Sequence, residues 1–252
     1  MAKSKQQLST FREHLEELRR RLLIAALAVA AGAAVAFVFH RDILRLLLRP
    51  ARGLLPVPDS SFIVTDVTEM LAISMKISLM GGFLLALPVV VYQVVMFIAP
   101  GLRPKEKRTI FRLVAPSILL FALGVAIAFF VVLPFTFDFL YQVAVNLGVG
   151  SPLLHIDQFL DFILMFMLGF GLAFQVPIIM YGLTAVGLVR AATWKKYWRL
   201  AVVAIFAFGA IITPDGSGVT MLLVSLPMAG LYVAGYVACV LHERKKGRAG
   251  AP

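Results

Sequence analysis

The sequence predicts an all-α integral membrane protein with six transmembrane helices, several of them kinked, and with both termini in the cytoplasm. Hydrophobic residues make up 61% of its 252 residues and charged residues only 15%, with a mean hydropathy of +0.93. Soluble domains are closer to half apolar and a quarter charged. The apolar residues gather in six long stretches, and about 20 such residues cross the hydrocarbon layer as a helix. Helices are expected because backbone groups in lipid must be hydrogen bonded within their own segment.

The six expected spans are uneven in length. We expect the fifth and sixth helices to be short, because the fifth stretch ends early and residues 214–218, Pro-Asp-Gly-Ser-Gly, predict a tight turn after it. A cytoplasmic segment at residues 1–21 precedes one membrane domain at residues 22–241, and a basic cytoplasmic tail follows at residues 242–252. The spans are Leu22–Phe39, Met70–Ala99, Leu113–Tyr141, Phe159–Val186, Trp198–Thr213 and Val219–Leu241.

The lysines and arginines collect in every second gap between these spans, which predicts the orientation. Most of the 24 lie before the first span, between the second and third, between the fourth and fifth, and after the sixth. Cytoplasmic loops carry the excess of positive charge, so both termini are expected in the cytoplasm. The formal charge of +11 follows from this topology, and membrane lipid is a more natural contact for it than nucleic acid. The opposite side carries four arginines in its first loop, namely Arg41, Arg45, Arg49 and Arg52.

Prolines and small residues inside the apolar stretches predict how the helices bend and pack. Each proline removes a backbone donor and crowds the preceding turn, which invites a kink. Ala28, Gly32 and Ala36 recur at four-residue spacing and predict close contact with a neighbouring helix. The five prolines are Pro88, Pro116, Pro134, Pro177 and Pro227.

Several classes of function lack the residues that they need. Cys239 is the only cysteine, so an intramolecular disulfide and a cysteine metal site are excluded. No nucleotide loop, zinc helix or nucleophile motif occurs, so we expect no enzyme, no metal and no cofactor. Arg19–Arg21 precede an apolar run as in a signal peptide, but the run is longer than a typical signal-peptide core and we expect no cleavage.

Four polar residues fall within or beside the apolar spans, where an ionisable group is costly unless it is paired or wet. Lys76 is expected to reach the outer surface or to pair with Asp66 or Glu69. Asp138 and Asp161 are expected to be solvated at the outer ends of the third and fourth spans. Gln175 lies deep in the fourth span, where its amide can bond to another helix or face a polar cavity used by a partner.

Two groups of acids lie on the cytoplasmic side. Residues 11–22 can form an amphipathic helix on which Glu13, Glu17 and Arg21 share one face, which is typical of a solvated ladder of ion pairs. Glu106 is the sole acid of the first internal loop and has basic neighbours on both sides, so a local salt bridge is the expected explanation for it. Taken alone, neither acid indicates a binding site.

Four segments of the chain form a recognisable set: His14–Arg19, Phe97–Leu102 with Glu106 behind it, Phe174–Pro177 and Ile212–Pro214. They resemble the signature segments of the TatC family, the multispanning receptor subunit of the twin-arginine protein translocase. The resemblance covers nearly the whole chain, and the segments occur in the family's order and at the family's places.

The resemblance implies a protein that recognises twin-arginine signal peptides of folded cargo proteins in the plasma membrane of a prokaryote. It implies transport with small single-span partners of the TatA and TatB type, in an oligomeric assembly, driven by the proton-motive force. No ATP or metal site is expected.

The resemblance also implies roles for individual residues. Glu17 and Glu106 match the carboxylates that receive the two arginines, since a carboxylate binds the planar guanidinium in a bidentate manner and lysine lacks that geometry. Arg19 and Phe97 match further positions of this signal-peptide site. Pro50 and Pro100 match structural prolines.

Gln175 departs from the family, because many relatives carry a glutamate at this position of the fourth span. An amide excludes a proton-carrying role there and leaves a role in docking the transmembrane helix of a partner. Ser217 occupies the place of the family's acid in the last turn, with Asp215 displaced by two residues, so no function is assigned to that acid.

The residues alone leave two other classes of function possible. An ion-coupled secondary transporter would need a midplane ionisable pair and internal repeats, and neither is evident in the sequence. A structural membrane scaffold would need only packing surfaces and would tolerate replacement of Glu17 and Glu106.

Overall fold

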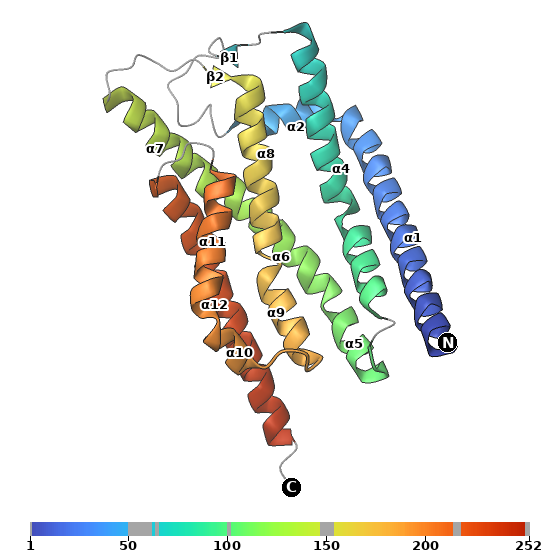
Figure 1. Cartoon of the computed structure of the whole chain (residues 1–252). Helices are drawn as coiled ribbons and strands as arrows, with labels where there is room; N and C mark the ends of the chain where they lie inside the picture. The colour runs from blue at the N-terminus through green and yellow to red at the C-terminus, as the bar shows by residue number, and fades with distance from the viewer. Residues whose placement is uncertain are drawn as a thin grey trace.

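Long helices run side by side along most of the chain in the computed structural model (Figure 1). The structure describes residues 2–49, 62–63, 66–99, 102–146, 154–213 and 218–249. In chain order the elements are α1 (Ala2–Val38), α2 (His40–Leu47), β1 (Phe62–Ile63), α4 (Val67–Ile98), α5 (Pro104–Arg112), α6 (Val114–Ile127), the π-helical turn η3 (Ala128–Val132), α7 (Leu133–Asn146), β2 (Leu154–His155), α8 (Ile156–Ala173), α9 (Val176–Ala185), α10 (Ala191–Lys196), α11 (Trp198–Ile212) and α12 (Gly218–Ala249).

Within the described residues, five helical stretches are long and apolar enough to cross a membrane, and α11 is a sixth, shorter apolar helix. This confirms the predicted all-α membrane fold and its short fifth helix. α1 begins and α12 ends at one end of the bundle, here called the terminal end, and α2, β1 and β2 lie at the other, the distal end (Figure 1). Both ends of the chain therefore lie on one side of the bundle.

The sixth helix differs from the prediction. α12 is 32 residues long, because the helix continues past Leu241 through the basic tail instead of ending with the apolar run. The α11–α12 hairpin nevertheless stops well short of the distal ends of α4 and α8 (Figure 1). The prediction of a short sixth helix is therefore wrong for α12 as a whole, whose additional residues lie at the terminal end.

The prolines bend the spans to different degrees. Pro177 lies in the first turn of α9, directly after Phe174 and Gln175 interrupt the fourth span, so the predicted kink is a complete break. Pro134 follows η3, whose wider turn accommodates the proline ring and its missing donor. Pro116 occupies the first turn of α6, where no donor is needed, while Pro88 and Pro227 lie inside continuous helices.

Small residues bring α1 and α4 together, as the spacing predicted. A Cβ atom added to Gly32 would lie 2.6 Å from the Gly82 carbonyl oxygen, and one added to Gly82 would lie 2.2 Å from the Ala33 nitrogen. A Cβ on Gly81 would lie 2.9 Å from the Cβ of Ala36. The two backbones are in direct contact, which any larger side chain would prevent.

The distal end contains a feature that the sequence did not predict. β1 pairs with β2 in parallel, with Phe62 opposite Leu154 and Ile63 opposite His155. Two-residue strands are too short to show an alternating pattern. β2 adjoins the first residue of α8, and β1 precedes α4 by a few residues, so the pairing joins the chain segments that come before these two helices.

Helix α8 is the most buried part of the bundle. Ile163, Phe166 and Phe170 are fully buried on it, and the aromatic rings continue through Phe162 to Phe137 of α7, 5.3 Å away between ring centroids. α8 packs mainly against α6. Its side chains therefore form much of the hydrophobic core of the bundle.

Candidate functional site

Glu17 is held by a partner on its own helix. Its Oε1 accepts hydrogen bonds from Nη2 of Arg21 at 2.6 Å and from Nε of Arg21 at 3.0 Å. Nη1 of Arg21 also donates to Oε1 of Gln93 on α4 at 3.2 Å. The side chains of Arg21 and Glu17 are 19% and 28% exposed, so this ion pair is only partly screened by solvent. It is one pair of the predicted ladder of Glu13, Glu17 and Arg21, more buried than expected, and Arg21 also bonds to Gln93 of α4.

A hollow of about 620 Å³ opens beside this ion pair, between α1 and α4. Acidic side chains dominate its α1 wall, while an aromatic ring, an amide and a thioether form the α4 wall. The lining residues are Glu13, Glu16, Glu17, Arg20, Arg21, Ile24, Tyr92, Gln93 and Met96.

Glu106 is half-buried in the first turn of α5 and faces a different hollow. Its Oε2 accepts the backbone N–H of Arg103 at 2.8 Å, which caps the helix. This backbone contact, and not a salt bridge with a basic neighbour, is the bond that Glu106 makes within the described residues. The second hollow measures about 640 Å³ and is lined by Arg103, Pro104, Glu106, Thr109, Ala185, Val186 and His242.

Phe97 joins α1 to the end of α4. Its ring stacks on the imidazole of His14, with centroids 4.5 Å apart and planes inclined by 23°. His14 lies three residues before Glu17 on α1, so the stack fixes the turn of α1 that leads to the carboxylate. Sequence reasoning found Phe97 but missed its contact with His14.

The structure places Arg19 apart from the carboxylates. Arg19 is exposed and lines a shallower hollow with Glu16, Arg20, Leu23 and Ile24. Arg21 is therefore the basic residue that orients Glu17. Pro50 and Pro100, expected to be structural, lie outside the described residues, as do Asp215 and Ser217.

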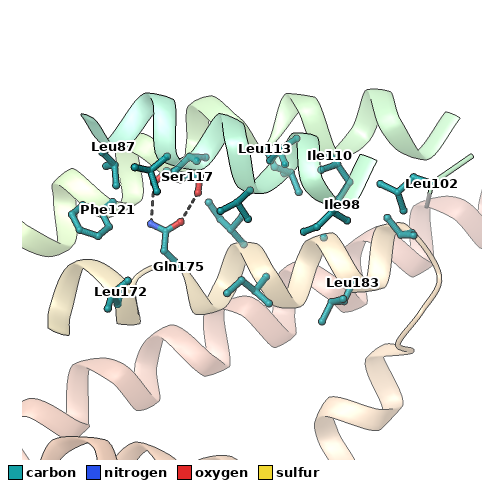
Figure 2. A pocket seen from close by; sticks show the side chains of 18 of the residues that line it. Leu87, Ile98, Leu102, Ile110, Leu113, Ser117, Phe121, Leu172, Gln175 and Leu183 are labelled. Carbon is teal, nitrogen blue, oxygen red and sulfur yellow. Dashed lines mark hydrogen bonds between the residues drawn. The ribbon is translucent and has the colours of Figure 1, made fainter. Parts of the chain in front are cut away.

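Gln175 bonds across to the third span at the break between α8 and α9 (Figure 2). Its Nε2 donates to the carbonyl oxygen of Ser117 on α6 at 3.0 Å, and the hydroxyl of Ser117 donates to Oε1 of Gln175. This confirms the predicted interhelical bond. Ser117, which is buried, was not identified from the sequence.

An apolar groove of about 320 Å³ lies beside this polar pair, between α4, α6 and α9 (Figure 2). Leucine, isoleucine, valine and phenylalanine side chains form most of its walls, including Leu87, Ile98, Ile110 and Leu183. Gln175 and Ser117 are the polar side chains among its lining residues. A groove of this kind, apolar with a localised polar contact, suits a hydrophobic helix that carries one hydrogen-bonding group.

At the distal end the structure corrects the expectation for Lys76. Its ammonium bridges two carboxylates of α8, with Nζ 2.7 Å from Oδ1 of Asp157 and 2.8 Å from Oδ1 of Asp161. Asp66 and Glu69 instead form the capping box of α4. Asp161, expected to be solvated alone, is thus ion paired between spans. Asp138 accepts from Gln142 one turn later at 2.8 Å.

No cluster of three or more histidine, cysteine, aspartate or glutamate side chains in the described ranges could hold a metal ion. The two hollows at the terminal end each contain at least one carboxylate that can accept a hydrogen bond.

The sequence matches the family described as Sec-independent protein translocase protein (TatC) over residues 13–227. The TatC protein of Aquifex aeolicus is 38% identical over 237 residues, which cover 93% of this chain and 96% of that protein. The chain belongs to the TatC family. The TatC protein of Cenarchaeum symbiosum is 36% identical, covering 96% of this chain and 98% of the relative.

Solved structures agree with this assignment. A crystal structure of the twin-arginine translocase receptor TatC superposes with a TM-score of 0.81 and 35% identity, covering 91% of this chain and 99% of that one. TatC proteins form a family of translocase receptor subunits and not of enzymes. The chain is accordingly a multi-pass membrane component of Sec-independent protein translocation.

Proposed function

We propose that this TatC-family chain is the subunit that receives twin-arginine signal peptides of folded cargo proteins, and that Glu17 and Glu106 bind the arginine pair. The observation that carries the proposal is that both carboxylates line open hollows near the terminal end. Each accepts hydrogen bonds from a single nearby residue of its own segment. Neither is enclosed in a structural network that would leave no room for a ligand.

Arginine suits these hollows better than lysine does. A guanidinium presents donors in a planar fork that matches the two oxygens of a carboxylate, whereas an ammonium is a hydrated point charge. The ion pair of Glu17 with Arg21 uses Oε1 for both bonds. An arriving guanidinium would therefore approach Oε2 or displace Arg21. Phe97 and His14 would hold α1 against α4 while this exchange takes place.

The apolar groove provides a place for a single-span partner of the TatA or TatB type. Its aliphatic walls and the polar pair of Gln175 and Ser117 support the docking of one face of a transmembrane helix there. Because residue 175 is an amide, it can bond to a partner helix but cannot carry a proton. Transport itself would draw on the proton-motive force through the assembled complex of several copies.

The orientation follows from charge. The basic residues of α1, α5 and α10 and of the last turns of α12 lie toward the terminal end. The positive-inside rule supports placing this end, and both termini, in the cytoplasm of a prokaryotic cell with the spans in its plasma membrane. Through the family resemblance Arg19 keeps a place in the proposed signal-peptide site, although Arg21 and not Arg19 pairs with Glu17. Pro50 and Pro100 keep the structural role that the resemblance implies.

Binding of fluorescent peptides to the purified chain tests the proposal. One peptide carries a twin-arginine signal and the other has both arginines changed to lysine. The wild-type chain should bind the arginine peptide more tightly, and Glu17→Gln and Glu106→Gln should each weaken that binding by about 1.5–3 kcal/mol. Asp138→Asn, the same chemical change at the distal end, serves as the control and should bind as the wild type does.

A structural scaffold is the alternative that this experiment addresses most directly. Its carboxylates would tolerate replacement, so equal binding of both peptides, or unchanged binding by both glutamine variants, would favour it. An ion-coupled transporter would need an ionisable pair at midplane. The interhelical ion pair of Lys76 instead lies within the first turns of α8, toward the distal end.

A further inference from the structure

His242 shares the hollow that contains Glu106, although the two residues belong to opposite ends of the sequence. Glu106 lies in the first turn of α5, and His242 lies on α12 beyond the last apolar residues of the sixth span. Ala185 and Val186, at the end of α9, complete the wall between them. The last helix of the bundle therefore contributes a side chain to one of the two proposed arginine sites.

The ring of His242 is held in place from α9. Its Nδ1 lies 3.2 Å from Oη of Tyr181, and the two rings meet edge to face with centroids 5.2 Å apart. The neighbouring Glu243 accepts the backbone N–H of Ala191 at 2.8 Å, which fastens the same turn of α12 to α10. His242 is thus half-buried and oriented, and not a freely rotating residue of the tail.

A guanidinium in this hollow needs more acceptors than Glu106 offers. It carries five N–H donors, and Oε2 of Glu106 already accepts the backbone N–H of Arg103. Pro104, Ala185 and Val186 contribute apolar side chains to the lining, and Arg103 is itself a cation. The further acceptors among the lining side chains are the hydroxyl of Thr109 and a ring nitrogen of His242.

We propose that His242 is a specificity-determining residue of the receptor, a second acceptor for the arginine that binds Glu106. This inference rests on the function proposed above. In the proposed arrangement Nδ1 of His242 carries the proton and donates to Oη of Tyr181, 3.2 Å away, so that Nε2 keeps a lone pair that accepts from the guanidinium. A guanidinium spreads its donors over a planar fork and can reach Glu106 and the ring together, whereas a lysine ammonium concentrates its donors on one atom and is expected to gain less from the ring. His242 therefore increases the affinity of the receptor for arginine more than its affinity for lysine.

Two substitutions of His242 separate an acceptor from a packing role. Phe keeps an aromatic ring against Tyr181 but has no nitrogen, whereas Gln loses the ring but supplies a side-chain oxygen. Binding of the twin-arginine and twin-lysine peptides is measured for the full chain in lipid nanodiscs, with Glu106→Gln in parallel. His242→Phe should lower affinity for the arginine peptide by about tenfold, the value of one hydrogen bond to a charged group, and leave the lysine peptide unchanged. His242→Gln should retain most of the preference.

The outcomes distinguish the inference from the function beneath it. If Glu106→Gln loses the preference for arginine while His242→Phe keeps it, the receptor function stands and the role of His242 is wrong. An equal loss in His242→Phe and His242→Gln would indicate packing and also overturn the acceptor role. If the wild-type chain shows no preference, the proposed function itself fails. The expected result is that His242→Phe loses the preference for the arginine peptide and that His242→Gln retains it.

Discussion

The two ends of α4 and α8 use charge in opposite ways. At the distal end Lys76 of α4 bridges Asp157 and Asp161 of α8, and the strands before the two helices are paired. Toward the terminal end the same two spans border an apolar groove, and the two glutamates proposed to bind arginine, Glu17 and Glu106, accept hydrogen bonds from their own segments. Charges bonded between spans hold the bundle together, whereas charges bonded locally beside a hollow can accept a ligand. Residue type alone does not separate the two roles.

The largest expected effect is at the terminal end. Glu106→Gln should weaken binding of a twin-arginine peptide by about 1.5–3 kcal/mol, because the hydrogen bond to a charged group is lost. Glutamine can still accept the N–H of Arg103 as the third residue of the capping box, so the melting temperature should stay close to that of the wild type. Peptide titration and thermal unfolding of the same preparation measure the two quantities. A large drop in the melting temperature would instead indicate that Glu106 stabilises the fold, as the charges at the distal end do.

Lys76→Met should produce the reverse pattern at the distal end. Two carboxylates would lose their shared cation, and since all three side chains are more than a third exposed, we expect a destabilisation of about 1–2 kcal/mol. Lys76→Arg, which keeps the charge, is the control. Adding Asp157→Asn and Asp161→Asn to Lys76→Met should recover part of the stability, as measured by thermal unfolding in detergent. Peptide binding weakened as strongly as in Glu106→Gln would contradict the division between the ends.

Gln175→Leu tests whether a partner helix docks in the apolar groove. We expect it to weaken association of the partner by about 1 kcal/mol, the value of one interhelical hydrogen bond in a membrane. The change removes both bonds with Ser117 while keeping a similar volume. Co-purification of a single-span partner should fall, and binding of signal peptide should remain. Leu172→Ile, at another lining position of the groove, controls for altered packing. If the partner is fully retained, Gln175 is not part of the docking surface.

The smallest effect has the opposite sign. Arg21→Gln removes the cation that occupies Oε1 of Glu17, so a peptide arginine should bind more tightly by a few tenths of a kcal/mol, up to about 1 kcal/mol, as for other partly exposed pairs. Titration at low and at high salt measures the change, and the gain should shrink as salt screens the charges. Arg20→Gln, which removes a cation from the same hollow, is the comparison. Weaker binding in Arg21→Gln alone would mean that Arg21 positions Glu17 more than it competes for it.

The positions of the spans could be predicted because hydropathy and length act within each segment. The partners of the polar residues could not, because they depend on which helices pack together. Lys76 lies close in sequence to Asp66 and Glu69, yet its partners Asp157 and Asp161 lie on the span that packs beside it. The bond between Gln175 and some other helix was predictable from its burial in an apolar run, but the identity of Ser117 was not.

The candidate site shows the same division. Glu17 and Glu106 were identified through resemblance to the TatC family, and the ion pair of Glu17 with Arg21 through helical spacing. The separation of the two carboxylates into different hollows, and the approach of His242 to one of them, follow from how α5, α9 and α12 meet. No local pattern encodes that meeting.

Photo-crosslinking from inside the two hollows tests the central claim most directly. A photoreactive amino acid would replace Met96 in the hollow of Glu17 or Thr109 in the hollow of Glu106, with exposed Phe130 of the third span as the control position. The account predicts that a twin-arginine signal peptide crosslinks at both hollow positions, that the twin-lysine peptide does not, and that Phe130 labels with neither. Equal labelling by both peptides, or labelling at Phe130 alone, would contradict it.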